Sequence, residues 1–222
     1  MNKLTTIQQD MRYAPLYTLA DISRYARVPL PTLKTWVGGM RPLIVPPERE
    51  VASLYSFMNL IEAHVIGALR RKHRVPLSRI RTAIRFLSQT QRSQHPLAEM
   101  DLELFGSKII VDRGGRKLTA SAGGQMALAE IIKPYLERLE WDERHLPTRF
   151  FPFTYDACPK TIVMDPLVAF GRPVIRGTRI ATVTVFDRYS GGESLREIAK
   201  DYDLKLPEVE EALRCEIERR AA

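Results

Sequence analysis

The stretch Y-T-L-A-D-I-S-R-Y-A-R-V-P-L-P-T-L-K-T-W-V occupies residues 17–37 and carries the signals of two short helices in succession. Thr18 is a favourable N-cap, and Asp21 follows three residues later, the position that a capping box uses. Pro31 suits the first turn of the second helix, where a missing N–H is harmless. Two short helices joined by a tight turn are the outline of a helix-turn-helix, whose second helix enters the major groove of DNA.

The outward side of the second helix supplies the candidate DNA contacts. Lysine and threonine side chains can reach phosphates or base edges, and flanking arginines suit phosphate contacts. The candidate DNA-binding residues are Arg24, Arg27, Pro31, Thr32, Lys34, Thr35 and Arg41. Leu33 and Trp36 are expected to pack inward. A helical bundle without a role in DNA binding is the alternative interpretation.

The positive charge of the chain is concentrated in its N-terminal half. The 222 residues have a formal net charge of +8. Residues 1–97 contain 15 Lys and Arg against 5 Asp and Glu, whereas residues 98–222 contain 19 against 21. This asymmetry favours a polyanionic partner, double-stranded DNA, at the N-terminal end. A solvated basic face without a partner is the alternative.

Two further amphipathic helices are predicted over residues 53–71 and 77–87. They contain L-I-E-A-H-V-I-G-A-L-R-R-K-H-R-V-P-L-S-R-I-R-T-A-I at 60–84. With the first stretch, this sequence resembles the MerR superfamily of winged helix-turn-helix regulators over residues 17–88. The resemblance implies that the loop 38–52 is a wing. The chain departs from that family because it has no long dimerisation helix leading directly to a short effector-binding tail.

The central part of the chain, residues 95–160, is predicted to contain strands, a helix and an extended linker. Strands are predicted at 104–111 and 116–120 around the turn D-R-G-G, followed by a helix from 121 to 143. An extended linker is expected over residues 144–160, which are rich in aromatic residues and proline. Residues 1–15 are expected to form a poorly ordered arm.

A run near the C-terminus, D-P-L-V-A-F-G-R-P-V-I-R-G-T-R-I-A-T-V-T-V-F-D, is the most distinctive in the chain and spans residues 165–187. Residues 174–185 are predicted to be rich in β-structure, because β-branched side chains suit short strands. Two helices are expected at 194–202 and 207–213, again with a helix-turn-helix outline. The second carries several glutamates that would repel phosphate, so this pair is interpreted as a packing or dimerisation element.

This C-terminal run is similar to VapB-type antitoxins of the domain-of-unknown-function-433 family over about residues 165–214. The signature residues are Gly171, Pro173, Ile175, Gly177, Thr178, Arg179, Gly192, Ser194, Asp201, Tyr202 and Leu204. The resemblance implies a partner toxin with a PIN-like RNase fold, encoded beside this chain. The candidate toxin contacts are Arg149, Phe151, Phe153, Arg176 and Arg179. Salt bridges from Arg176 and Arg179 to Asp165 or Asp187 are the alternative.

The sequence therefore predicts a mainly helical α+β protein. The expected parts are a MerR-like winged helix-turn-helix head at 1–94, a β-hairpin, helix and linker at 95–160, and a β-then-helix-turn-helix module at 161–222. The predicted function is that of a type II antitoxin, which neutralises a PIN-like ribonuclease and represses its own operon as a homodimer.

A MerR-like ligand-responsive transcriptional regulator is the alternative function. Its pocket would lie in residues 95–160, where the candidate lining residues are Phe150, Phe151, Phe153 and Tyr155. Such aromatic residues also occur in cores and protein interfaces.

An enzyme is not expected. The four histidines lack the H-x-x-x-H and H-E-x-x-H spacings, so no metal site or cofactor is predicted. There is no G-x-S-x-G elbow or phosphate-binding loop. Cys158 and Cys215 are far apart and are expected to behave as small buried hydrophobic residues. Without an apolar leader or a long apolar run, the protein is predicted to be cytoplasmic.

Overall fold

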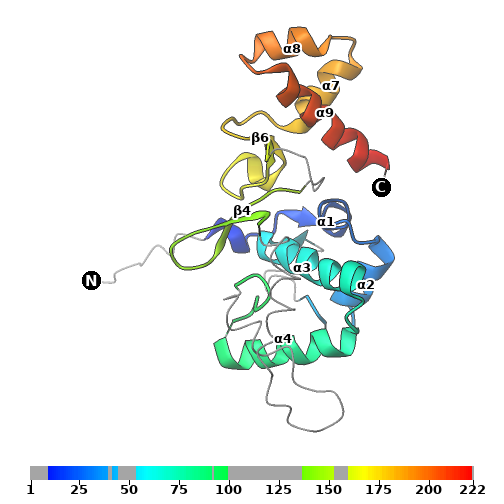
Figure 1. Cartoon of the computed structure of the whole chain (residues 1–222), viewed down its shortest axis with the longest axis vertical. Helices are drawn as coiled ribbons and strands as arrows, with labels where there is room; N and C mark the ends of the chain where they lie inside the picture. The colour runs from blue at the N-terminus through cyan, green and yellow to red at the C-terminus, as the bar shows by residue number, and fades with distance from the viewer. Residues whose placement is uncertain are drawn as a thin grey trace, which may run out of the picture.

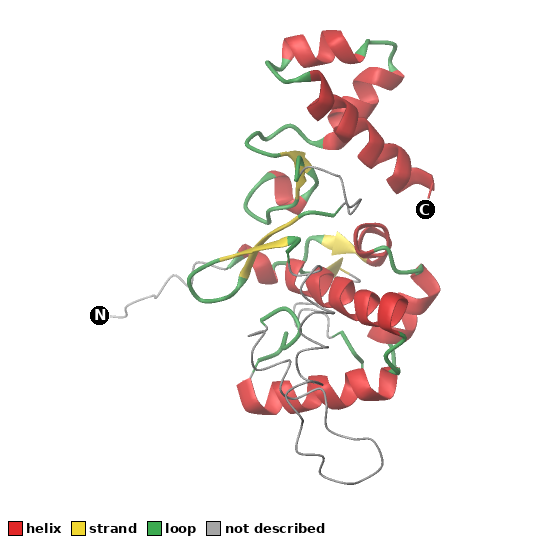
Figure 2. Ribbon diagram, in the orientation of Figure 1, coloured by secondary structure: helices red, strands yellow, loops and turns green. Residues whose placement is uncertain are grey.

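The computed structural model describes residues 10–39, 42–44, 54–91, 93–99, 137–152 and 160–221. The described residues form seven α-helices and three small two-stranded antiparallel sheets, which confirms the mainly helical α+β class (Figure 2). The predicted hairpin at 104–120, most of the helix at 121–143 and most of the loop at 38–52 lie outside the described residues. No helix in the described part of the chain is long and apolar enough to cross a membrane.

The first two helices form where the sequence predicts them. α1 (Leu19–Ala26) begins with a capping box, in which the Thr18 hydroxyl accepts from the Asp21 N–H at 3.1 Å and the Asp21 carboxylate accepts from the Thr18 N–H at 3.0 Å. α2 (Leu30–Val37) has Pro31 in its first turn. Strand β1 (Tyr17–Thr18) pairs with β2 (Leu54–Tyr55) just before the next helix.

α3 (Phe57–His73) is the central helix of the N-terminal part, and α4 (Leu77–Gln91) follows it after Pro76 (Figure 1). A second capping box, Ser56 with Asn59, starts α3. Nearly every side chain of its first three turns is buried, because α1 packs on one side and the following segments pack around it. The N-terminal core contains Tyr17, Ile22, Leu33, Trp36, Phe57, Leu60, Ile61, Ile66, Leu139, Phe150 and Met164, among others.

A β-hairpin stands where the sequence predicted the end of a helix. β3 (Leu139–Trp141) pairs with β4 (Pro147–Phe150), so the prediction of a helix through residue 143 is wrong over 137–143. The Asp142 carboxylate accepts from the backbone N–H groups of Arg144 and Leu146, both at 2.9 Å, and closes the turn. These bonds and the burial of Leu139 and Phe150 in the N-terminal core favour the strand pair over helix.

The C-terminal module begins with β5 (Ile162–Val163) paired to β6 (Val174–Ile175). Three helices then pack together: α7 (Thr182–Ser190), α8 (Leu195–Asp201) and α9 (Leu206–Ala221). The prediction of β-structure through residue 185 is wrong beyond Ile175. The spacing of Thr182 and Val185 suits a helix face as well as a strand, and packing against α9 buries both side chains.

The C-terminal module has its own core, made of Ile162, Ile175, Val185, Ile198, Ala199, Val209, Ala212, Leu213 and Cys215. In Figure 1 its helices lie at one end of the molecule and α4 at the other, with the strands between them. The far end of α9 returns toward α1, close to the predicted DNA-binding helices.

Candidate functional site

The outer side of α2 presents polar side chains to solvent. Pro31, Lys34 and Thr35 are exposed, whereas Leu33 and Trp36 are buried, as the sequence predicted. Thr32 is half-buried, and its carbonyl accepts a hydrogen bond from the Thr35 hydroxyl at 2.7 Å. Within the described residues, Lys34 has no ion-pair partner. The outer side of α2 therefore presents one cation, Lys34, and the Thr35 side chain to solvent.

The two predicted phosphate-binding arginines of α1 have acidic neighbours. Arg24 lies 3.8 Å from Asp21 on the same helix. Arg27 ends α1 in the left-handed conformation, with φ of 54°, and its guanidinium lies 2.9 Å from the carboxylate of Glu218 on α9. The C-terminal module thus supplies an anion at the turn between α1 and α2. Arg41 lies outside the described residues.

The arginines among the predicted toxin contacts are exposed, whereas Phe151 is buried. Arg149 on β4 bonds to Asp165 and Glu140, both at 3.0 Å, and these hydrogen bonds, that of Glu140 first, raise the pKa of its guanidinium. Arg176 bonds to Glu140 at 2.8 Å. Glu140 therefore joins Arg149 and Arg176, whereas the sequence suggested Asp165 or Asp187 as the acidic partner of Arg176.

Phe151 and Arg179 have opposite environments. Phe151 is 2% exposed and packs with Val163 and Val174, while Lys160 and Arg176 lie over its ring. Its aromatic ring therefore belongs to the protein interior. Arg179 is exposed after β6, and Phe153 lies outside the described residues.

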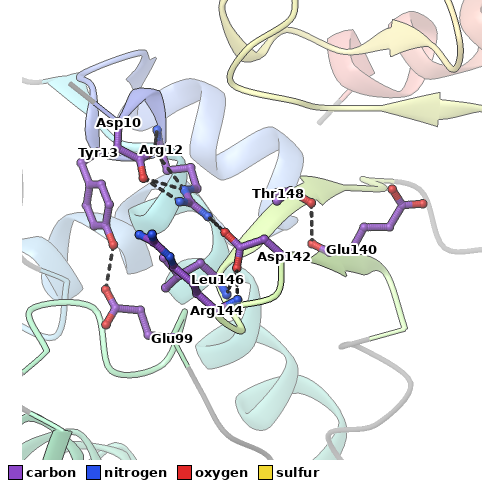
Figure 3. Close-up of polar contacts among 9 residues, drawn as sticks. All are labelled: Asp10, Arg12, Tyr13, Glu99, Glu140, Asp142, Arg144, Leu146 and Thr148. Atoms are coloured by element: carbon purple, nitrogen blue, oxygen red, sulfur yellow. Dashed lines mark hydrogen bonds and ion pairs between the residues drawn. The ribbon is translucent and has the colours of Figure 1, made fainter. Parts of the chain in front are cut away.

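A group of charged side chains that no sequence pattern indicated lies near the N-terminus and lines a cleft; Figure 3 shows its polar contacts. The helical turn η1 (Met11–Tyr13) falls in the segment expected to be a poorly ordered arm. Arg12 donates to Asp142 and to Asp10, both at 2.6 Å, and Figure 3 shows the guanidinium between the two carboxylates. Tyr13 donates to Glu99 at 3.0 Å. Because Arg12 and Asp142 are 130 residues apart, no local pattern could have indicated this contact.

Two carboxylates of this cleft, those of Asp10 and Asp142, have a lowered pKa. Burial raises the pKa of Asp10, but hydrogen bonds from Arg12 lower it by more, so the pKa lies below its ordinary value. For Asp142, burial again raises the pKa, and hydrogen bonds from Leu146, Arg12 and Arg144 outweigh it. The cleft has a volume of about 700 Å³, and Met11, Pro166 and Leu167 form an apolar part of its lining.

A second cavity, of about 350 Å³, lies where the N-terminal part meets the C-terminal module. Its lining includes Tyr17 and Asp21 from the first part and Phe170, Thr182 and Glu216 from the second. Beside it, the buried Tyr17 hydroxyl donates to the carbonyl of Gly171 at 2.9 Å. This bond connects the first strand of the N-terminal part to the signature run of the module.

Gly171→Ala is expected to destabilise the protein by about 2–3 kcal/mol. Gly171 has φ of 73°, and an added Cβ would overlap the Tyr17 hydroxyl and displace its hydrogen bond. Gly177→Ala is the matched control: its φ is 81°, but a Cβ there meets nothing within 4 Å, so only backbone strain is added. Urea unfolding of both variants measures the difference. Equal losses would contradict the close approach of the two parts.

Comparison with known proteins places the C-terminal run in a recognised family. Residues 162–214 match the family described as "Protein of unknown function (DUF433)". "Putative antitoxin VapB45" of Mycobacterium tuberculosis (strain ATCC 25618 / H37Rv) is 30% identical over 227 residues, which cover 90% of this chain and 92% of that protein.

A second mycobacterial protein and a solved mycobacterial structure are also similar along most of their length. "Uncharacterized protein Rv2308" of the same strain is 26% identical over 221 residues, covering 89% of this chain and 88% of that protein. The crystal structure of Rv2018 from Mycobacterium tuberculosis superposes with a TM-score of 0.70 at 28% identity, covering 90% of this chain and 97% of that one. The chain therefore belongs to the family of the mycobacterial VapB45 protein and carries the DUF433 region of that family at residues 162–214.

Proposed function

We propose that this protein is the antitoxin of a type II toxin-antitoxin pair, which binds and neutralises a toxin encoded beside it and represses their common operon. The observation that carries the proposal is the similarity to the VapB45 protein over nearly the whole of both chains, including both the N-terminal part and the module. A non-enzymatic role agrees with that relationship.

The toxin is proposed to be a PIN-like ribonuclease. The signature G-R-P-V-I-R-G-T-R at 171–179 motivates this identification. The active sites of such nucleases are clusters of acidic residues that hold metal ions, and the exposed Arg172, Arg176 and Arg179 would complement a surface of that charge.

The DNA-binding part is proposed to be α1 and α2, acting as a helix-turn-helix with a MerR-like arrangement. Exposed Lys34 and Thr35 on α2 support this role, since α2 would enter the major groove. Repressors of this kind usually bind paired half-sites as two-fold dimers, so a homodimer is proposed as the DNA-binding form. Repression would then be tightest when the operator has two half-sites related by symmetry.

Co-expression with the neighbouring gene tests the proposal. The full chain should restore growth to cells that express the neighbouring product, should co-purify with it, and should stop it from cleaving RNA. The same chain should retard a DNA fragment containing its own promoter. If the chain bound no product of a neighbouring gene, the proposed antitoxin function would be wrong.

A ligand-responsive regulator is the second candidate, favoured by the two cavities of about 350 and 700 Å³, since ligand sites have volumes of this order. Of the aromatic residues predicted to line a pocket, Phe150 and Phe151 do not support this candidate, because both are buried in the interior. Phe153 and Tyr155 lie outside the described residues. A metabolite that changes promoter affinity in the absence of any toxin would favour this candidate.

A further inference from the structure

Two large apolar side chains project from the signature run into solvent. Leu167 is 79% exposed and Phe170 is 74% exposed, more than any other large apolar side chain in the described ranges. Leu167 precedes the helical turn η2 (Ala169–Gly171), and Phe170 is the central residue of that turn. We call residues 167–171 the apolar knuckle. Exposure of two such side chains three residues apart is unfavourable in water, and exposed apolar patches often mark interaction sites.

The backbone holds the knuckle in an unusual conformation. Three consecutive residues have positive φ: Ala169 at 47°, Phe170 at 55° and Gly171 at 73°. Only glycine adopts this region without strain, so the two non-glycine residues are kept there by their surroundings. Strained backbone of this kind is concentrated at functional sites.

The contacts beneath the knuckle are specific. The Asp165 carboxylate accepts from the Leu167 N–H at 2.9 Å, and Gly171 donates to the Val168 carbonyl at 2.9 Å. Val168 and Ala169 pack against the cluster that contains Phe151, while the Tyr17 hydroxyl binds the Gly171 carbonyl. Leu167 and Phe170 are therefore presented on a fixed support, which lowers the entropy lost when a partner binds.

The sequence around the knuckle is rich in basic residues. Residues 160–179 contain four basic residues and one acid, Asp165. The exposed basic residues are Lys160, Arg172, Arg176 and Arg179. Among the described residues, Arg172 and Arg179 form no ion pair, so both charges are available to a partner.

We propose that the apolar knuckle is the surface that docks the toxin, inserting Leu167 and Phe170 into an apolar recess bordered by carboxylates. This inference rests on the proposed antitoxin function. DNA is a poor candidate for this surface, because its phosphates make no favourable contacts with two exposed apolar side chains. A second copy of this chain is also disfavoured, because a symmetric contact would bring together the exposed Arg172 of each copy, which directly follows the knuckle. A toxin with an acidic active site satisfies both the apolar and the charged features.

The experiment compares two doubly substituted full-length chains. Leu167→Ser with Phe170→Ser removes the knuckle, whereas Tyr189→Ser with Ile217→Ser removes two other exposed apolar side chains, which lie on α7 and α9 and are 46% and 51% exposed. Titration calorimetry with the purified product of the neighbouring gene gives the affinity. The knuckle variant should bind at least about 100-fold more weakly, because central apolar anchors dominate interface energies. The control variant should bind like the wild type, and both should keep wild-type promoter affinity.

A second measurement uses the unaltered protein. Hydrogen exchange at the amides of residues 167–171 should slow when the toxin is added. Equal toxin affinity of the knuckle and control variants, or unchanged exchange in the complex, would overturn the docking surface and leave the antitoxin function standing. A knuckle variant that loses self-association but keeps toxin affinity would also overturn it. If the wild-type chain fails to bind the product at all, both the surface and the proposed function fall.

Discussion

Replacing Lys34 and Thr35 together with alanine should weaken binding to the protein's own promoter by at least about 30-fold, since each good base contact is worth about 1–3 kcal/mol. Both side chains are exposed on α2, and the buried Leu33 and Trp36 hold the helix from behind. Truncating the two exposed residues therefore removes contacts without disturbing the fold. Lys200→Ala, an exposed lysine on α8, is the charge-matched control.

Mobility shift at several salt concentrations measures this effect. Loss of a phosphate contact would also reduce the salt dependence of binding, because fewer counterions are released. If the double variant shifted the promoter as well as the Lys200→Ala control does, α2 would not be the reading helix.

A substitution in the C-terminal module should have the opposite effect and strengthen promoter binding. Glu218 on α9 holds the guanidinium of Arg27 at 2.9 Å, at the turn between α1 and α2. A carboxylate at this position competes with DNA phosphate for Arg27 and repels the phosphate as well. Glu218→Gln should therefore strengthen promoter binding by a few-fold, most clearly at low salt. Weaker binding would indicate that the pair orients Arg27 toward DNA instead.

His95→Ala should lower the free energy of unfolding by about 3–5 kcal/mol at neutral pH, the cost of breaking a buried pair by removing one partner. His95 Nδ1 lies 3.1 Å from the Glu62 carboxylate, and both side chains are buried beside α3, 7% and 3% exposed. Asn59 approaches the same carboxylate at 3.4 Å and cannot replace the histidine alone. Urea unfolding measures the loss. A loss below about 0.5 kcal/mol, as for an ordinary surface substitution, would contradict this role.

The variant Glu62→Gln removes the charge of the buried carboxylate and keeps the size of the side chain. Burial raises the pKa of Glu62 and hydrogen bonds from His95 and Asn59 lower it by less, so its pKa lies above its ordinary value of 4.5 in the folded protein. The stability that this group contributes is fully present below pH 4.5 and is lost as the pH rises through the folded-state pKa. Glutamine does not titrate, so the variant should gain stability relative to the wild type as the pH rises from 4.5. A difference that stays constant between pH 4 and pH 8 would show that Glu62 is not perturbed.

The sequence by itself determined the features that depend on near neighbours. Thr18 and Asp21 cap α1, and Pro31 lies in the first turn of α2, because the atoms involved are within one helical turn. The inward positions of Leu33 and Trp36 follow from helical periodicity. The signature run at 171–179 identified the family of the C-terminal module for a related reason, since a family signature is a pattern of adjacent residues.

Only the tertiary structure decided the features that join distant segments. Residues 137–143 and 176–190 have patterns that suit either helix or strand, and burial of Leu139 in one core and of Val185 in the other selected the outcome. The ion pairs of Arg12 with Asp142 and of Arg27 with Glu218 join residues 130 and 191 positions apart. The exposure of Leu167 and Phe170 likewise does not follow from the sequence, because large apolar side chains are most often buried. Residues 169–171 have a left-handed backbone, and the hydrogen bond from Tyr17 to Gly171, which joins residues 154 positions apart, links this exposed segment to the N-terminal part.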